Sequence, residues 1–304
     1  MELGLIGLGR MGANMTKRLL QGGHRVVCYD RNPEAVRRVA GEGAVGADLP
    51  ATLAEQLPGP RIVWLMIPAG DPVDRMIQTM APFLSAGDVI VDGGNSNYKD
   101  TMRRVAKLKE QGLHFVDVGT SGGIWGVTEG YSLMVGGDPD VVGRLRPLFE
   151  TLAPAPDRGW GYVGPSGAGH FVKMIHNGIE YGLMQAYAEG FAILKQKAEL
   201  GLDLHQVAEI WRHGSVVRSW LLDRISDALA DQPDLSGIAP YVADSGEGRW
   251  TVFEAIDLDV AAPVISLSLL ARLRSRDQDA FADKLLAVMR DRFGGHGVRR
   301  EEQV

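Results

Sequence analysis

Short apolar runs alternate with amphipathic segments over the first half of the chain. Five runs have the length and composition of buried strands, and the segments after the third and fourth runs have helical periodicity. The strand runs cover residues 2–6, 25–29, 61–67, 88–91 and 114–118, and the helical segments cover 71–83 and 98–111. A hairpin-like pair near 131–135, a helix from Pro139 and a strand near 161–163 follow. This alternation predicts an α/β domain with a parallel sheet over residues 1–164.

Strand signals largely stop at Ser166, and helical periodicity continues from there toward the C-terminus. The helical segments lie at 171–200, 203–212 and 219–230, with another from Trp250 and two more up to Arg292. We therefore expect an all-helical second domain over residues 165–304. The chain offers no internal repeat and no low-complexity segment that would suggest a different organisation.

Composition agrees with a two-domain globular protein of 304 residues, since 45% of them are hydrophobic and 23% are charged. The net charge of −6 argues against nonspecific nucleic-acid binding, which needs a basic surface. Cys28 is the single cysteine, so no disulfide framework is expected and a reducing compartment is favoured. The first eight residues lack a basic region and are too few for a membrane span. We expect a cytoplasmic protein without membrane association.

A glycine-rich turn follows the first predicted strand and precedes a helical segment that runs through Leu20. In this place the pattern G-x-G-x-x-G is typical of dinucleotide-binding α/β domains of the Rossmann type. The first glycine makes the tight turn, the second lets the backbone approach a pyrophosphate, and the third permits close packing of helix on strand. The predicted cofactor-binding residues of this turn are Gly7, Gly9, Arg10, Met11 and Gly12.

The second strand ends in Asp30, about 20 residues after the glycine turn. A carboxylate there accepts hydrogen bonds from the ribose hydroxyls of NAD and repels a 2′-phosphate, so NAD is favoured. Arg31 follows directly and could pair with that phosphate, which leaves NADP open. The same residues, Asp-Arg-Asn-Pro, also suit a turn that leads into a helix, and both interpretations can hold together.

Two further glycine-rich loops come directly after predicted strands, at 92–96 and 119–123. Ligands of open α/β sheets bind past the carboxyl ends of the strands. Asn95 and Ser121 offer short polar side chains there, and Gly122 and Gly123 expose backbone N–H groups. Turn formation alone would also account for either loop.

The long helical segment from Gly167 carries the most informative side chains of the sequence. Lys173, His176, Asn177, Glu180 and Tyr181 share one helical face, while apolar residues form a stripe on another. Two turns, about 10 Å, separate Lys173 from Glu180. An amine and a carboxyl group held near one small molecule are suited to acid–base chemistry. The alternative is that these residues simply form the solvated face of an amphipathic helix.

Polar segments near the C-terminus supply two more candidate sites. Residues 244–250 form a glycine-rich polar loop before a helix, a geometry that binds phosphate or hydroxyl groups. Residues 290–296 place arginine, glycine and histidine at the end of the last helix. Such an end can also be an ordinary cap with cations that balance the helix dipole.

Taken together, these segments resemble the decarboxylating 6-phosphogluconate dehydrogenases of the β-hydroxyacid dehydrogenase superfamily, and the chain length resembles the short bacterial type. The resemblance spans nearly the whole chain and is most specific at 167–182. The matching segments are GLGRMG at 7–12, VDGGNS at 91–96, SGG at 121–123, GAGHFVKMIHNGIEYG at 167–182, AR at 271–272 and RDRFGGH at 290–296.

The resemblance implies a role for each matching residue. Lys173 corresponds to a general base and Glu180 to a general acid. Asn95 borders both the cofactor and the sugar acid. The other residues that correspond to those holding the carboxylate and hydroxyl groups of the sugar acid are Ser121, Gly122, Gly123, His176 and Asn177. The residues that correspond to phosphate contacts are Tyr181 and Arg272, with Arg249 in place of a phosphate-binding loop lysine of the long forms. Arg290 and His296 correspond to a tail that reaches a partner subunit's site, so a homodimer or homotetramer is implied.

The activity implied is oxidative decarboxylation of 6-phosphogluconate to ribulose 5-phosphate and CO₂ with reduction of NAD or NADP, without a metal. This is a step of gluconate metabolism and the pentose phosphate pathway. One alternative is a non-decarboxylating β-hydroxyacid dehydrogenase of the hydroxyisobutyrate or tartronate semialdehyde type. Another is a dinucleotide-binding sensor without catalysis, which would have no reason to keep the stripe from Lys173 to Glu180.

Overall fold

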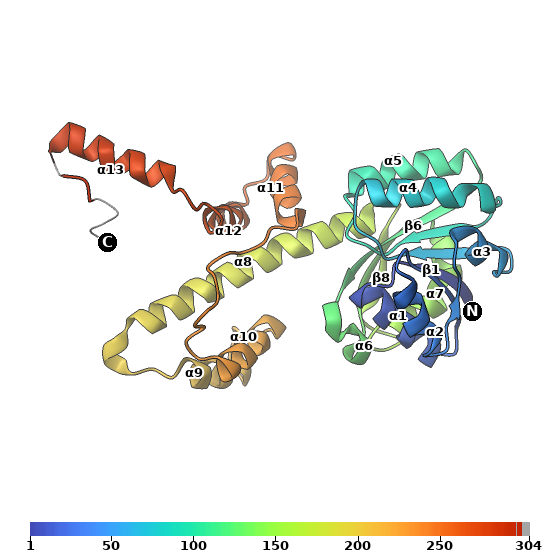
Figure 1. Cartoon of the computed structure of the whole chain (residues 1–304), viewed down its shortest axis with the longest axis horizontal. Coiled ribbons are helices and arrows are strands. Elements are labelled where there is room, and N and C mark those ends of the chain that lie inside the picture. The colour runs from blue at the N-terminus through green and yellow to red at the C-terminus, as the bar shows by residue number, and fades with distance from the viewer. Residues whose placement is uncertain (296, 300–304) are drawn as a thin grey trace. The chain divides into compact units, whose positions relative to one another are not determined.

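The computed structural model describes residues 1–295 and 297–299, and the chain divides into two compact units. The first unit is Met1–Gly178, and the second begins at Ile179 (Figure 1). The predicted domain boundary after residue 164 coincides with the end of the last strand. The boundary between the compact units comes later in the sequence, between Gly178 and Ile179, within the long helix Ala168–Gln196.

The first unit contains a sheet of eight strands in the order β3-β2-β1-β4-β5-β6-β7-β8 among the described residues. Neighbouring strands are parallel except β6 and β7. The strands are β1 (Glu2–Ile6), β2 (Arg25–Tyr29), β3 (Val45–Gly46), β4 (Ile62–Leu65), β5 (Val89–Asp92), β6 (His114–Ser121), β7 (Ser132–Gly136) and β8 (Trp160–Gly164). The predicted parallel α/β sheet is confirmed.

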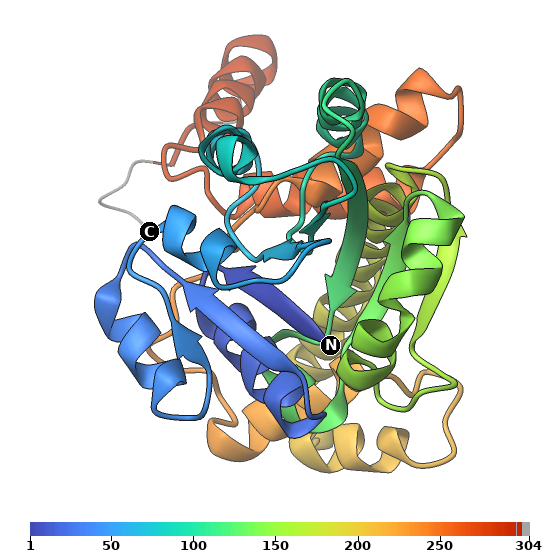
Figure 2. The same ribbon diagram turned by 90° about the vertical axis from the view of Figure 1, so that its right-hand side faces the viewer.

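Helices cover both faces of this sheet, as Figure 2 shows. One face packs against α1 (Arg10–Gln21), α2 (Pro33–Ala40) and α7 (Pro139–Leu152). The other packs against α3 (Pro50–Glu55), α4 (Asp71–Met80) and α5 (Tyr98–Lys109). A short helix, α6 (Gly126–Glu129), and two 3₁₀ turns, Ala81–Phe83 and Gly123–Trp125, complete the unit.

The strands are apolar at successive positions because both of their faces are buried. In β4, Trp64 belongs to the core beneath α1 and α7, whereas its neighbours Val63 and Leu65 belong to the core beneath α3 and α4. The same alternation occurs in β1, where Leu5 and Ile6 face opposite sides. Continuous apolar runs therefore identified these strands correctly.

The expected hairpin-like pair near 131–135 is wrong in one respect. This region supplies a single strand, β7, which pairs antiparallel with β6 and parallel with β8. A parallel crossover needs about a dozen or more connecting residues, usually including a helix that spans the sheet. The segment between Ser121 and Ser132 is too short for such a crossover and contains only the 3₁₀ turn Gly123–Trp125 and the short α6, so the chain reverses direction.

Helices alone make up the second unit among its described residues. After α8 (Ala168–Gln196), which starts in the first unit, come a 3₁₀ turn at Ala198–Leu200 and five further helices. They are α9 (Leu204–Arg212), α10 (Trp220–Asp231), α11 (Glu247–Asp257), α12 (Pro263–Arg274) and α13 (Phe281–Gly294). Asp203 and Ser219 cap α9 and α10 with their side chains. The predicted Rossmann-type domain followed by an all-α domain is confirmed, and no helix in the described residues has both the length and the apolar character of a membrane span.

Candidate active site

The glycine turn after β1 requires glycine at two of its positions for reasons that can be measured in the structure. Gly7 has φ of 98°, and a Cβ atom there would lie 2.4 Å from the carbonyl oxygen of Met66. A Cβ atom on Gly12 would lie 1.9 Å from the carbonyl oxygen of Gly7. Larger residues would therefore separate α1 from the strand that precedes it.

Gly9 is different, because a Cβ atom there would meet no atom of the protein within 4 Å. It is the N-cap residue of α1, whose first turn has neither a side-chain cap nor an acidic residue. The N–H groups of this turn therefore face a surface where a phosphate group can approach the backbone closely. Arg10 is exposed and Met11 half-buried beside it. This arrangement fits the pyrophosphate of a dinucleotide.

Asp30 is fixed against the same turn. Its Oδ2 accepts a hydrogen bond of 2.6 Å from the N–H of Leu8, and its Oδ1 accepts one of 2.8 Å from the N–H of Asn32. The carboxylate thus holds the glycine turn in place. It also lies where an acidic residue would accept hydrogen bonds from the ribose hydroxyls of a bound dinucleotide. Arg31 is exposed next to it.

Asp92 organises the loop that carries Asn95. The Asp92 carboxylate is buried and accepts hydrogen bonds from the N–H of Gly94 at 3.1 Å and from the hydroxyl of Ser96 at 2.6 Å. Asn95 is held between these two residues and is exposed. The sequence analysis included Asp92 in the loop but did not single it out, although an acid at the end of an apolar strand was a usable signal.

The loop after β6 begins at Ser121, the last residue of that strand. Gly122 and Gly123 have φ of 130° and 52°, and residues with a side chain rarely adopt such values. The Asn14 amide on α1 donates a hydrogen bond of 3.1 Å to the carbonyl oxygen of Ile124. The glycine turn and the Ser121 loop are therefore neighbours on one side of the sheet.

A buried aspartate on β6 determines where α8 begins. Both oxygens of the Asp117 carboxylate accept backbone hydrogen bonds at the start of that helix, from Gly167 at 2.7 Å and His170 at 2.9 Å. The helix also lies unusually close to the sheet, since a Cβ atom on Gly169 would lie 2.5 Å from the carbonyl oxygen of Asp117. Asp117 was not among the site residues predicted from the sequence, although a charged residue within the apolar run 114–118 was a usable signal.

Lys173, His176 and Asn177 come together on the first turns of α8. Lys173 Nζ donates to Asn177 Oδ1 at 2.7 Å and lies 3.2 Å from His176 Nδ1. Lys173 is only 5% exposed and Asn177 only 8%, so the alternative of a solvated helical face is wrong for these two residues. The solvent instead reaches part of the apolar stripe, because Ile179 is 51% exposed.

Gly119 on β6 makes the close approach of Lys173 possible, because a Cβ atom there would lie 2.4 Å from Lys173 Cβ. We expect Gly119→Ala to destabilise the fold by about 1–3 kcal/mol through overpacking. Displacement of the lysine should also lower kcat by about 10- to 100-fold. Urea unfolding and steady-state kinetics measure both effects. Gly161→Ala in β8 is the control, since its Cβ meets nothing within 4 Å. Equal behaviour of the two variants would contradict the prediction.

In the helical unit, Tyr181 and Arg272 stack on each other. The Arg272 guanidinium lies 3.5 Å from the centroid of the Tyr181 ring, a cation–π arrangement. Arg272 also donates a hydrogen bond of 2.9 Å to the carbonyl oxygen of Ala243. A Cβ atom on Gly248 would lie 2.3 Å from the ring, so a glycine is needed where α11 meets Tyr181. Two residues far apart in the sequence, both predicted to bind phosphate, are thus adjacent.

Asp244 connects this pair to Arg249. The Arg249 guanidinium donates to Asp244 Oδ2 at 2.7 Å, Arg276 Nη1 lies 3.7 Å from the same oxygen, and the Tyr181 hydroxyl donates to Oδ1 at 3.4 Å. Burial alone would raise the pKa of Asp244, but the hydrogen bond from Arg249 and the backbone N–H of Gly246 outweigh it and lower the pKa. The carboxylate is therefore charged and balances two arginines. Neither Asp244 nor Arg276 was among the site residues predicted from the sequence.

For the other predicted site residues, Glu180, Arg290 and His296, the structure gives at most the position and the exposure of the side chain. Glu180 is half-buried on α8, two turns beyond Lys173, and Arg290 is exposed on α13. His296 lies outside the described residues. Within the part of the chain that the structure describes, no three histidine, cysteine, aspartate or glutamate side chains are grouped as metal ligands.

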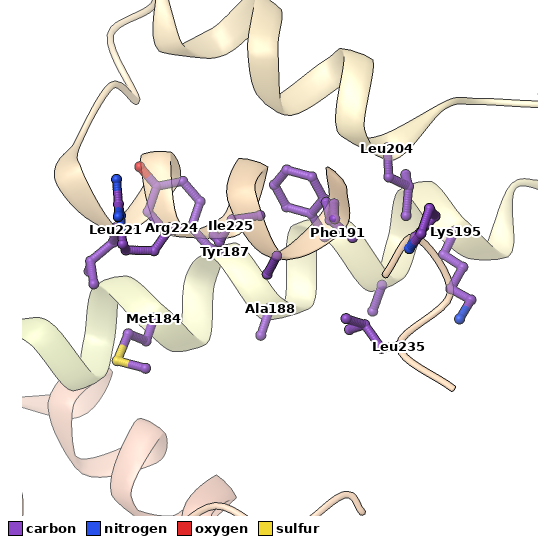
Figure 3. A pocket seen from close by; sticks show the side chains of 14 residues that line it. Met184, Tyr187, Ala188, Phe191, Lys195, Leu204, Leu221, Arg224, Ile225 and Leu235 are labelled. Atoms are coloured by element: carbon purple, nitrogen blue, oxygen red, sulfur yellow. The ribbon is translucent and has the colours of Figure 1, made fainter. Parts of the chain in front are cut away.

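A separate cavity of about 470 Å³ lies between α8, α9 and α10 (Figure 3). Its lining is mostly apolar and includes Met184, Tyr187, Phe191, Leu221, Ile225 and Leu235. A phosphorylated sugar acid needs charged and hydrogen-bonding groups, and this lining provides few of them. The cavity is therefore not the place where we expect a substrate of that kind.

Two family models cover the chain in the order that the two units suggest. The NAD binding domain of 6-phosphogluconate dehydrogenase matches residues 2–164. The C-terminal domain of 6-phosphogluconate dehydrogenase matches residues 169–283. The chain belongs to the 6-phosphogluconate dehydrogenase family. Membership explains why the glycine turn, the Asn95 and Ser121 loops and the Lys173 helix occur together.

Individual members of the family are similar over the full chain. The NAD(+)-dependent, decarboxylating 6-phosphogluconate dehydrogenase of Haloferax volcanii is 44% identical over 303 residues, which are 99% of this chain and 100% of that protein. The Plasmodium falciparum 6-phosphogluconate dehydrogenase structure gives a TM-score of 0.83 at 30% identity, over 100% of this chain and 67% of that chain. A Mycobacterium tuberculosis 3-hydroxyisobutyrate dehydrogenase gives 0.73 at 22% identity over 91% and 94% of the two chains, which shows a shared fold alone.

Proposed function

We propose that this protein catalyses the oxidative decarboxylation of 6-phosphogluconate to ribulose 5-phosphate and CO₂ with reduction of NAD. The observation that carries the proposal is the buried lysine at the start of α8, which Asn177 holds at 2.7 Å and which packs against Gly119, on the strand that ends at Ser121. The decarboxylating relative with 44% identity over the full chain supports the same reaction.

Lys173 is the proposed general base. In its neutral form the amine accepts the proton of the C3 hydroxyl while hydride leaves the same carbon. A nicotinamide cofactor held at the glycine turn would supply the hydride acceptor. Lys173, now protonated, places its positive charge beside the oxygen on which negative charge develops as CO₂ leaves the β-keto acid. The lysine therefore performs the role for which other decarboxylases use a metal ion.

Glu180 is the proposed general acid. Loss of CO₂ leaves an enediol, and a proton must be added to its terminal carbon to give the ketopentose phosphate. A carboxylic acid on the same helix as the base can donate that proton. A dehydrogenase that does not decarboxylate has no need for this second group, so Glu180 favours the decarboxylating reaction over the hydroxyisobutyrate type.

Tyr181, Arg249 and Arg272 are proposed to bind the phosphate of the substrate. Arginine guanidinium groups present several N–H donors in a planar fork that suits phosphate oxygens. Asn95, Ser121, Gly122, Gly123, His176 and Asn177 are proposed to hold the carboxylate and hydroxyl groups. A substrate without phosphate would leave the cluster around Arg272 without a function.

An assay that follows two products tests the proposal directly. Purified protein is mixed with 6-phosphogluconate and NAD, and NADH and CO₂ are measured together. We expect the two products in equal amounts. NADH without CO₂ from 6-phosphogluconate, together with faster oxidation of 3-hydroxyisobutyrate by NAD or faster reduction of tartronate semialdehyde by NADH, would favour the non-decarboxylating alternative. NAD binding without turnover on any sugar acid would favour the sensor.

Asp30 is proposed to select NAD over NADP, since its carboxylate lies beside Leu8 of the glycine turn. Removal of the charge by Asp30→Asn or Asp30→Ala should lower the ratio of kcat/KM for NAD to that for NADP by about tenfold, which corresponds to about 1.4 kcal/mol. Steady-state kinetics with each cofactor give the ratio, and thermal unfolding verifies that the turn is intact. An unchanged ratio of kcat/KM for NAD to that for NADP in both variants would contradict the proposed role of Asp30.

A second copy of the chain is proposed to cover the apolar surface of the helical unit. Phe281, Leu285, Val288 and Met289 lie on one face of α13 and are all exposed. The chain spans 67% of the Plasmodium falciparum chain that it matches. Arg290 and His296 are proposed to reach that copy's substrate site. Sedimentation of a single species with the mass of a monomer would contradict the proposal.

The cytoplasm is the proposed location. Cys28 is a free thiol buried beneath α1, and burial raises its pKa to about 11, so the thiol stays protonated and unreactive. A chain without a disulfide is suited to a reducing compartment. Fractionation of cells that express the tagged protein tests this assignment.

A further inference from the structure

A buried histidine joins the helix of Lys173 to the loop of Asn95. His170 lies on the first turn of α8 and is 1% exposed. Its Nε2 lies 3.2 Å from the carbonyl oxygen of Asp92, and its Nδ1 lies 2.7 Å from the hydroxyl of Thr101 on α5. Since a carbonyl oxygen only accepts hydrogen bonds, Nε2 carries the hydrogen and donates it to Asp92.

Asp92 transmits this contact to the loop beyond it. Its carboxylate holds the N–H of Gly94 and the hydroxyl of Ser96, the two residues that flank Asn95. The buried guanidinium of Arg104, which also donates hydrogen bonds to Asp74, lies 3.6 Å from the same carboxylate. The loop therefore keeps its shape around Asp92, and a shift of the Asp92 backbone would move Asn95 with it.

The backbone of His170, at the helix end of this connection, is fixed as well. The N–H of His170 donates to Asp117 Oδ2 at 2.9 Å, so the buried carboxylate that starts α8 also fixes the histidine backbone. Lys173 follows one turn later and packs against Gly119, which lies on the same strand as Asp117. These contacts restrict movement of the Asp92 carbonyl group relative to Lys173.

We propose that His170 and Asp92 are positioning residues, which set the place of the Asn95 side chain relative to Lys173 through the hydrogen bond from His170 Nε2 to the Asp92 carbonyl group. The kinetic consequence rests on the proposed function, whereas the connection between loop and helix does not. An error of about 1 Å in the placement of groups around a reacting carbon costs about 100-fold in rate.

Two substitutions of His170 separate its two contacts. The amide nitrogen of glutamine can reach the place of Nε2, while that of asparagine reaches only the place of Nδ1. We expect His170→Gln to keep kcat within about threefold of the unaltered protein and His170→Asn to lose about 100-fold. Hydrogen exchange measured by mass spectrometry without ligands should accelerate at residues 93–97 in the asparagine variant and not in the glutamine variant.

His24→Asn is the matched control, because His24 is also a buried histidine of the first unit but contacts Thr151 and the N-terminal amine. It should leave the exchange at 93–97 and kcat unchanged. Equal exchange at 93–97 in the glutamine and asparagine variants would overturn the inference, whatever the activity. Failure of the unaltered protein to form NADH and CO₂ from 6-phosphogluconate would instead overturn the proposed function, and the exchange rates would still decide the connection.

Discussion

Lys173→Met is expected to lower turnover of 6-phosphogluconate by about 10⁴-fold while leaving the dissociation constant for NAD within about threefold of the unaltered value. The substitution removes the proposed base for the hydroxyl proton and also removes the positive charge proposed to stabilise the developing oxyanion, and the two effects act on successive steps. Methionine has a similar length and is apolar, so the buried position against Gly119 should tolerate it. Stopped-flow measurement of NADH formation gives the turnover rate. Titration with NAD, followed by quenching of the protein's tryptophan fluorescence, gives the dissociation constant.

Lys173→Arg distinguishes the charge of the residue from its action as a base. Arginine keeps the positive charge but stays protonated at any working pH, so it cannot accept the hydroxyl proton. We expect this variant to be nearly as slow as Lys173→Met. Lys107→Met, at an exposed lysine of α5, is the control for loss of one lysine. Turnover above a tenth of the unaltered rate in the arginine variant would show that another group is the base.

Glu180→Gln is expected to slow steady-state turnover by about 10²- to 10³-fold for a different reason. Hydride transfer and loss of CO₂ precede the step that needs the acid, so they should still occur once. The first turnover should therefore give a burst of one NADH and one CO₂ per site, followed by a slow phase limited by protonation of the enediol. Rapid quenching with measurement of both products detects the burst.

The control for this substitution is Glu189→Gln on the same helix, where the exposed Glu189 carboxylate accepts a hydrogen bond from Gln185. This variant should turn over normally. A Glu180→Gln variant without a burst would mean that Glu180 acts at or before hydride transfer. Unchanged steady-state turnover would mean that the carboxyl group does not donate the proton.

Much of the first unit could be read from the sequence because its signals are local. A strand buried on both faces is apolar at most successive positions, so β1, β4 and β5 were found from their runs alone. The conformations of Gly7 and Gly12 follow from the requirement for a tight turn and close packing, which only glycine meets. The helices of the second unit were likewise found from periodicity.

The residues that the sequence analysis missed act across long stretches of chain. Asp117 looks like an interruption of an apolar strand until its partners, the N–H groups of Gly167 and His170, are seen 50 and 53 residues further on. Asp244 looks like a turn residue until Tyr181 and Arg276 are found beside it. No window of sequence contains both members of these pairs.

The sequence by itself determined which elements form, which loops follow the strands, and which residues share a face of the long helix, because each depends on chain geometry over a few residues. Only the tertiary structure decided which face of α8 is covered. The apolar stripe with Ile179 is largely exposed, whereas Lys173 and Asn177 are buried. The physical reason is the contact with β6, where Gly119 provides the space and Asp117 holds the start of the helix. Both of these residues lie on β6, so a helical wheel of the α8 sequence cannot show which face of the helix is buried.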